Sequence, residues 1–418
     1  MSPERPRSRI VEAVIFATIL LDFVGFSILI PVLPLYASDL GASAIEVGLL
    51  LSLYSLGLVL FLPFWGWVSD RAGRRPVILF CLLGTTFYFV LLALADTVLE
   101  LYAARALGGF FGASIGTAQA YITDITSPED RARGMGLIGA AFGIGFVLGN
   151  TLGGVLHGVH PTFPFYATAG LALLNFGVAV VFLPESKRES PLDGSFRGLA
   201  RALVPTPIQL FAGAHENRTR LYLYLFFHIF AAFSAMEAMF PLYARLRFGW
   251  SPLDIGLFLG YLGLVIVGTQ LLVIGPLSRR YGEAPLVVIG LFLTGGGMAL
   301  MPLARGLSGL LVVGTAIALG NGIAFPTFTS LFSKTCGGEE TGEFLGHSQS
   351  MAQTGRALGP YWGGWAFGSI GGGAPLFLGG IGVLGAALFF VFGFRILVPR
   401  PEDRSETGAS ERSTDLPL

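Results

Sequence analysis

Charged side chains are scarce in this chain of 418 residues: they make up 12% of it, while hydrophobic residues make up 53%. Soluble domains carry about twice that share of charge, and a soluble fold could not bury so much apolar surface. The formal net charge is zero, which excludes the basic surface that nucleic-acid binding needs. The composition therefore predicts a protein embedded in a lipid bilayer, with no nucleic-acid partner.

Cysteine and histidine are also rare. Cys81 lies in an apolar run and Cys336 in a polar segment far along the chain, so the pair predicts neither a disulfide framework nor a metal site. The five histidines lack the spacing of metal ligands, and no nucleophile with a neighbouring base is apparent. We expect no enzyme activity, no metal and no cofactor.

Apolar runs of about 20 residues, the length that a helix needs to cross a bilayer, recur along the chain. They predict an all-α polytopic membrane protein with twelve transmembrane helices, at 10–33, 45–66, 77–95, 98–121, 135–156, 163–183, 220–242, 253–275, 286–303, 307–331, 344–368 and 375–398. The first run follows a basic segment, as in a signal peptide, but no small-residue cleavage site comes after it. We expect an uncleaved first span, and an even count places both termini on one side.

Basic residues are divided unevenly between the two sides of the membrane. Of the 26 Lys and Arg, two (Arg105 and Arg356) lie deep inside the predicted spans and three in loops of one parity, which leaves 21 in the loops, termini and span ends of the other side. By the positive-inside rule, that side and both termini are cytoplasmic. The longest break, 184–219, predicts a cytoplasmic linker between an N-terminal half (1–183) and a C-terminal half (220–398), with a polar cytoplasmic tail at 399–418.

The two halves repeat each other in sequence. Pro34-Leu35-Tyr36-Ala37 recurs as Pro241-Leu242-Tyr243-Ala244, an offset of 207 residues. Three further segments recur in the same order: Gly41-x-Ser43 as Gly249-x-Ser251, Gly66-x-x-Ser69-x-Arg71-x-Gly73 as Gly275-x-x-Ser278-x-Arg280-x-Gly282, and Gly149-x-x-x-Gly153-Gly154 as Gly359-x-x-x-Gly363-Gly364. Both copies begin on the same side of the membrane, so we expect parallel repeats, an arrangement found in transporters.

Three segments carry a resemblance to a known family. The run Gly66-Trp-Val-Ser-Asp-Arg-Ala-Gly-Arg-Arg-Pro76 is similar to the signature loop of the major facilitator superfamily. Asp22-Phe23-Val24-Gly25 resembles the first span of its tetracycline efflux proteins, and Arg105-Ala106-Leu107-Gly108-Gly109 resembles the motif of span four. The resemblance covers almost the whole chain and is strongest to the drug/proton antiporters. It implies a monomeric secondary transporter in the bacterial inner membrane.

The fifth span carries a motif similar to that of the antiporters, formed by Gly145, Gly149, Asn150, Gly153 and Gly154. The family has Pro where Asn150 stands, and the second half keeps that Pro as Pro360. The sequence leaves open whether Asn150 alters antiport.

Two charged residues lie within the spans of the first half. A charge there costs about 2.5–3.5 kcal/mol on insertion scales and needs a partner or a wet cavity. Asp22 is either a carboxylate neutralised by Arg105 for helix packing or, as the resemblance implies, a proton carrier. Arg105 shares a helical face with glycines and Gln119, and such a face also serves close packing. We expect Asp22 and Arg105 to couple protons, and Asp22 and Gln119 to line a substrate cavity.

The second half also carries charges within its spans. Glu237 has two possible roles. It is either a hydrated carboxylate near the outer interface, or it faces the substrate and shares in proton coupling, because the resemblance places span seven at the central cavity. Gln353 and Arg356 lie on one stripe of span eleven, which either holds helices together or lines the cavity. We expect cavity lining.

The signature loop is implied by the resemblance to act as a conformational latch. Asp70 would meet the start of span eleven, where a helix N-terminus favours negative charge, and Arg74 would pair with Asp124. Together they would hold the outward-facing state. The latch residues are Gly66, Asp70, Arg71, Gly73, Arg74 and Asp124.

The function expected from the resemblance is proton-coupled efflux of small amphiphilic or cationic compounds, as in multidrug efflux and antibiotic resistance. The alternative is a proton-coupled sugar or metabolite transporter, whose site would call for more Asn, Gln and Trp and fewer carboxylates within apolar spans. A non-transporting regulator would not require both a latch and charges within the membrane.

Overall fold

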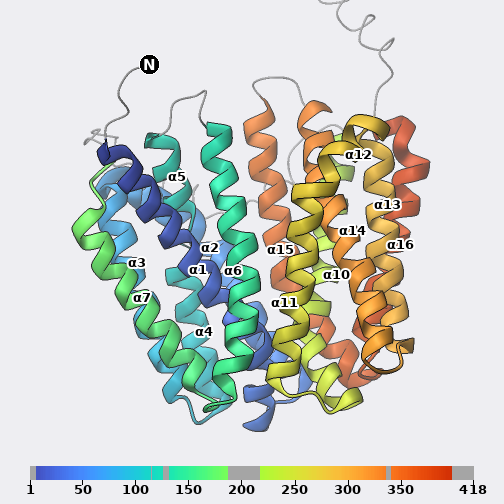
Figure 1. The fold of residues 1–418 in the computed structure, drawn as a ribbon, viewed down its shortest axis with the longest axis horizontal. Coiled ribbons are helices and arrows are strands. Elements are labelled where there is room, and N and C mark those ends of the chain that lie inside the picture. The colour runs from blue at the N-terminus through green and yellow to red at the C-terminus, as the bar shows by residue number, and fades with distance from the viewer. Residues whose placement is uncertain (1–5, 114, 126–130, 187–216, 336–339, 398–418) are drawn as a thin grey trace, which may run out of the picture.

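The computed structural model describes residues 6–113, 115–125, 131–186, 217–335 and 340–397. These residues form helices and short connections, with no strand among them. Figure 1 shows two helical bundles side by side, the N-terminal half in blue to green and the C-terminal half in yellow to red. The predicted all-α membrane fold is confirmed.

The N-terminal half consists of α1 (Pro6–Asp39), α2 (Ala44–Ala72), α3 (Arg74–Leu94), α4 (Val98–Gly112), α5 (Ile115–Ile125), α6 (Arg131–His157) and α7 (Phe163–Phe182). The fourth predicted span, 98–121, is matched by a candidate membrane span at Val98–Tyr121, within which α4 ends at Gly112 and α5 begins at Ile115. Glycine disfavours a helix by about 1 kcal/mol per residue, and Gly108, Gly109 and Gly112 cluster at this break.

The C-terminal half consists of α10 (Asn217–Phe248), α11 (Pro252–Gly268), the π-helical turn η1 (Thr269–Val273), α12 (Ile274–Tyr281), α13 (Glu283–Leu300), the 3-10 turn η2 (Met301–Leu303), α14 (Gly306–Thr335), α15 (Glu340–Ser369) and α16 (Ala374–Leu397). The eighth span therefore changes pitch where α11 passes through η1 into α12. Of the predicted divisions, most of the linker and the whole polar tail lie outside the described residues.

Eleven spans within the described residues are long and apolar enough to cross a membrane. The twelfth segment, α15, has 30 residues and sufficient length, but its polar stripe lowers its hydropathy. A polar stripe is tolerated in a membrane when it faces protein or a water-filled cavity.

Equivalent helix starts in the two halves are fixed by the same cap. Ser43 accepts a hydrogen bond from the backbone of Glu46, whose carboxylate accepts from the Ser43 backbone at 2.8 Å. Ser251 and Asp254 repeat this arrangement at the start of α11, with the return bond at 2.9 Å. Such a cap stabilises a helix by about 1 kcal/mol. The sequence repeat is thus also a repeat of local structure.

The most extensive helix contacts between the halves are those of α2 with α15 and of α6 with α11. Gly154 on α6 lies so close to α11 that a Cβ there would be 2.6 Å from the Pro252 carbonyl oxygen. On the other pair, a Cβ at Gly48 would overlap the carbonyl oxygen of Pro360. Both contacts lie near the first residues of α2 and α11, which is the end of the molecule opposite to the start of α1.

An ion pair joins the halves at the same end. Arg245 Nη1 at the end of α10 lies 2.6 Å from Asp39 Oδ1 at the end of α1. Both side chains are about half exposed, so the pair adds at most about 1 kcal/mol. Together with the glycine contacts, it closes this end of the bundle.

Candidate functional site

The first charged cluster lies inside the N-terminal half. Asp22 on α1 sits deep in the protein yet keeps part of its surface accessible. Phe26, one turn further along α1, packs its ring 5.8 Å from that of Tyr54 on α2. Tyr54 and Tyr88 both lie close enough to Asp22 and Arg105 to interact electrostatically with them. Four helices thus bring two opposite charges and two phenols into one region.

Arg105 is held in this cluster by an aromatic face. Its guanidinium carbon lies 4.5 Å from the centroid of the Tyr54 ring, a cation–π contact. The side chain is only 3% exposed, and its Nε and Nη1 have no hydrogen-bond partner among the described residues. A buried donor without a partner costs about 1–3 kcal/mol. Arg105 therefore keeps two buried donors that a further partner would satisfy.

The ion pair between Asp22 and Arg105, one of the alternatives from the sequence, does not form in this conformation, although the structure describes both side chains. Tyr54 covers one face of the guanidinium, while the in-plane donors Nε and Nη1 have no partner among the described residues.

The glycines beside Arg105 serve helix packing. A Cβ at Gly109 would lie 2.7 Å from the Tyr54 carbonyl oxygen, and one at Gly112 would lie 2.6 Å from the Tyr54 hydroxyl. Gln119, further along on α5, is half-buried.

The second charged cluster lies inside the C-terminal half. Arg356 Nη1 on α15 approaches Glu237 Oε2 on α10 at 3.9 Å. The Arg356 guanidinium also lies 5.3 Å from the ring centroid of Phe230. Glu237 is therefore not isolated. Sequence spacing could not reveal this partner, because the two residues are far apart in the chain. Gln353, one turn before Arg356, is half-buried.

The fifth-span motif packs one face of α6 against α1. Cβ atoms at Gly145, Gly149 and Gly153 would each meet α1 at close range, at Phe23, Val24 and Ile28 in turn. Gly154 instead faces α11. Asn150 is fully buried, and its Nδ2 donates to the Phe146 carbonyl oxygen at 2.8 Å.

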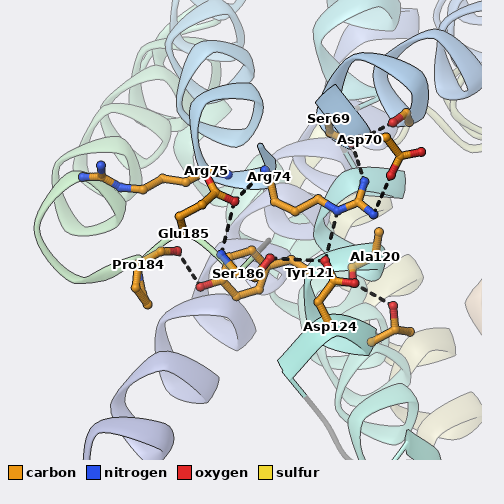
Figure 2. Close-up of polar contacts among 12 residues, drawn as sticks. Ser69, Asp70, Arg74, Arg75, Ala120, Tyr121, Asp124, Pro184, Glu185 and Ser186 are labelled. Atoms are coloured by element: carbon orange, nitrogen blue, oxygen red, sulfur yellow. Dashed lines mark hydrogen bonds and ion pairs between the residues drawn. The ribbon is translucent and has the colours of Figure 1, made fainter. Parts of the chain in front are cut away.

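The signature loop is built around Arg74 (Figure 2). Its Nη2 lies 2.9 Å from Asp70 Oδ1, its Nε lies 3.1 Å from Asp124 Oδ2, and its Nη1 donates to Ser69 Oγ at 2.6 Å. The pair of Arg74 with Asp124 is present as expected. All these residues belong to the N-terminal half, so this network does not itself join the halves. The start of α15, the expected partner of Asp70, lies outside the described side chains.

Glu185 is a participant in the loop that the sequence motif did not reveal. Its carboxylate accepts hydrogen bonds from the backbone N–H groups of Arg74 at 2.8 Å and Arg75 at 3.2 Å (Figure 2). These are the first residues of α3, where a helix favours negative charge. Gly73 adopts φ +93° and leaves room for the carboxylate, since a Cβ there would lie 2.5 Å from Glu185 Oε2.

The other two latch residues contact groups nearby in the chain, and the Gly66 carbonyl oxygen accepts a hydrogen bond from Ser69 Oγ at 2.9 Å. The Arg71 guanidinium stacks 3.9 Å from the Trp67 ring centroid and donates to the Trp67 carbonyl oxygen at 3.2 Å. Gly66 has open space at its Cβ position.

The sequence model of the Major Facilitator Superfamily matches residues 15–360 and 269–417. The chain belongs to this superfamily. A tetracycline resistance protein of class C from Escherichia coli is 33% identical over 352 residues, which cover 83% of this chain and 87% of the relative. Multidrug resistance protein 1 of Bacillus subtilis is 28% identical over 371 residues, or 86% and 90% of the two chains.

Solved structures agree with this membership. The human organic anion transporter MFSD10 (TETRAN) superposes with a TM-score of 0.69 at 26% identity, covering 92% of this chain and 99% of that one. The peptide transporter POT superposes with a TM-score of 0.76 over 92% and 94% of the two chains, but at 16% identity, so it supports the fold alone. The superfamily assignment made from the sequence motifs is confirmed.

Two shallow hollows on the surface of this major facilitator protein lie away from all of these residues. One, of about 540 Å³, is lined by residues between Leu300 and Val313, and the other, of about 520 Å³, by residues between Gly170 and Phe182 on α7. Their linings are mostly apolar. The charged clusters inside the two halves are therefore the better candidates for a substrate pathway.

Proposed function

We propose that this protein is a proton-coupled exporter of small amphiphilic or cationic compounds. The printed names of its relatives, tetracycline resistance and multidrug resistance proteins, support export of drug-like substrates. The observation that carries the proposal is Asp22, a carboxylate deep in a membrane span that keeps accessible surface and lacks an ion-pair partner among the described residues.

Asp22 supplies a simple means of exchange. A carboxylate removed from water is costly as a bare anion, so it takes up a proton or a positively charged partner. A proton and a cationic substrate then compete for one site, and alternating access converts this competition into antiport. Arg105, with its unpartnered donors, is the residue that we assign to release or hold the Asp22 charge as the cavity changes. Gln119 lines the same pathway.

The loop around Arg74 is assigned to the switch between states. The halves meet at the end opposite to the loop, and we assign the opening of the site to the loop side. Contact of Asp70 with α15 would close the loop side and favour the opposite, outward-facing state. The protein acts as a monomer in the inner membrane of a bacterium, with both termini in the cytoplasm.

Proton-driven transport tests the function. In proteoliposomes with an imposed pH gradient, the wild type should move tetracycline and other amphiphilic cations against a concentration gradient, and should not move sugars. Asp22→Asn should abolish this active transport while it retains substrate binding that no longer depends on pH.

The matched control is Asp96→Asn, which removes one carboxylate from an exposed loop and should transport as the wild type does. Active transport by Asp22→Asn would show that Asp22 is not the proton carrier, and Glu237 would replace it as the candidate. Accumulation of sugars instead of drugs would show that the substrate is a sugar or metabolite and not an amphiphilic drug.

A further inference from the structure

The Glu237 and Arg356 pair differs from the Arg74 network because it is incomplete. Its 3.9 Å separation exceeds the roughly 2.7–2.9 Å of a charge-assisted hydrogen bond. Neither side chain makes a hydrogen bond to another described group. The carboxylate therefore keeps unused acceptors, and the guanidinium keeps unused donors.

The surroundings do not compensate for this incomplete bonding. A buried ion pair offsets its lost hydration only when the geometry is close and further hydrogen bonds are present. Here the side chains of Glu237 and Arg356 are 12% and 22% exposed, so each keeps a surface that a small molecule or water can reach. The missing bonds must come from outside the protein.

An aromatic wall borders the two charges. Phe230 lies under the Arg356 guanidinium and packs edge-on against Phe325 of α14, with ring centroids 5.5 Å apart. Phe325 is 40% exposed. Accessible aromatic faces bind apolar and aromatic groups, so the site offers a positive group, a negative group and an apolar surface close together.

We propose that Glu237, Arg356 and Phe230 form a subsite for zwitterionic amphiphiles, which deepens the proposed export function and rests on it. The positive group of the substrate binds the Glu237 carboxylate, and its negative group binds the Arg356 guanidinium. A singly charged compound pairs with one of the two protein charges and leaves the other charge without a partner. Such an unsatisfied charge selects against the wrong ligand.

Three matched fluorescent probes test the charge preference: Nε-dansyl-lysine is a zwitterion, its methyl ester a cation, and its Nα-acetyl derivative an anion. Their dissociation constants are measured by dansyl fluorescence on the full-length protein in lipid nanodiscs. The zwitterion should bind about tenfold more tightly than either derivative, the effect of one additional charge-assisted hydrogen bond.

Variants of the Glu237 and Arg356 pair should change the order of the three probe affinities in opposite directions. Glu237→Gln should favour the anion, Arg356→Gln should favour the cation, and the double variant should bring all three within about threefold of each other. The matched control, Asp39→Asn with Arg245→Gln, removes the exposed ion pair between the halves and should leave the order unchanged. Opposite shifts in the single variants keep the test decisive if the double variant fails to fold.

Equal binding of the three probes, or a zwitterion preference that survives the double substitution, would overturn the subsite. So would absence of binding by all three while proton-driven drug transport persists. A zwitterion preference without proton-driven transport would instead uphold the subsite and remove the proposed function.

Discussion

At the scale of single residues, Arg74 shows how a short motif becomes a rigid structure. One guanidinium contacts two carboxylates and a hydroxyl, which uses the planar, forked donors that lysine lacks. The side chain is 9% exposed, so its bonds are shielded from water. Loss of this one cation removes a contact that Asp70 and Asp124 share.

We expect Arg74→Ala to lower the free energy of unfolding by about 2–3 kcal/mol, because charge-assisted hydrogen bonds are lost and charged acceptors are left behind. Transport should fall as well. Thermal unfolding in detergent and uptake into proteoliposomes measure the two effects.

Arg75→Ala is the control, because it removes the same charge from the next residue, which is more exposed. Exchange of the charges at Arg74 and Asp124 should restore function only in part, since Asp70 would then face a carboxylate. Wild-type stability in Arg74→Ala would contradict a structural role for the network.

At the scale of helices, the glycine motifs decide how closely the halves approach. On α6, Gly145, Gly149 and Gly153 face α1, while Gly154 faces α11. The equivalent residues Gly359 and Gly364 of α15 face α10 and α2 in the same manner. The fifth span of each half, α6 or α15, therefore packs against its own half with one face and against the other half with the adjacent face.

We expect Gly154→Ala to push α6 away from α11 and to open the closed end more often. The added methyl group would lie 2.6 Å from the Pro252 carbonyl oxygen, and such overpacking costs about 1–3 kcal/mol. The opening is measured by the rate at which maleimide labels Thr151→Cys. The background is a chain in which both natural cysteines are replaced by serine.

Gly170→Ala is the matched control, because its Cβ position has no atom within 4 Å. Labelling should rise in Gly154→Ala and remain unchanged in Gly170→Ala. Equal labelling in the two variants would mean that the α6 and α11 contact does not limit opening.

At the scale of the whole molecule, we expect the distribution of charge to set the orientation in the membrane. The 21 basic residues on the side of the termini favour a cytoplasmic location by the positive-inside rule. The closed end, with the Asp39 and Arg245 pair, then faces away from the cytoplasm.

Reporter fusions check this orientation. An alkaline phosphatase fused after Leu418 or within 184–219 should be inactive, and a green fluorescent protein at either point should fluoresce, since both points are expected in the cytoplasm. A phosphatase fused at Val159, in the connection between α6 and α7, should be active and serves as the control. Phosphatase activity at either cytoplasmic point would reverse the topology.

The sequence by itself determined the class of fold, because bilayer thickness fixes the length of an apolar helix and backbone groups in lipid must be satisfied within it. It also determined the internal repeat and the superfamily, since these are local patterns of spacing. The pairing of Arg74 with Asp124 was implied by the family resemblance. The capping boxes at Ser43 and Ser251 follow from the same short-range chemistry.

Only the tertiary structure decided which distant residues meet. It joined Glu237 to Arg356 and Glu185 to the start of α3, and it turned Arg105 toward Tyr54 and not into an ion pair with Asp22. Helical spacing says which residues share a face of one helix, but not which helix that face meets or which rotamer a long side chain adopts there. Those choices depend on how all the helices pack together, and so the partners of the buried charges could not be deduced from the sequence.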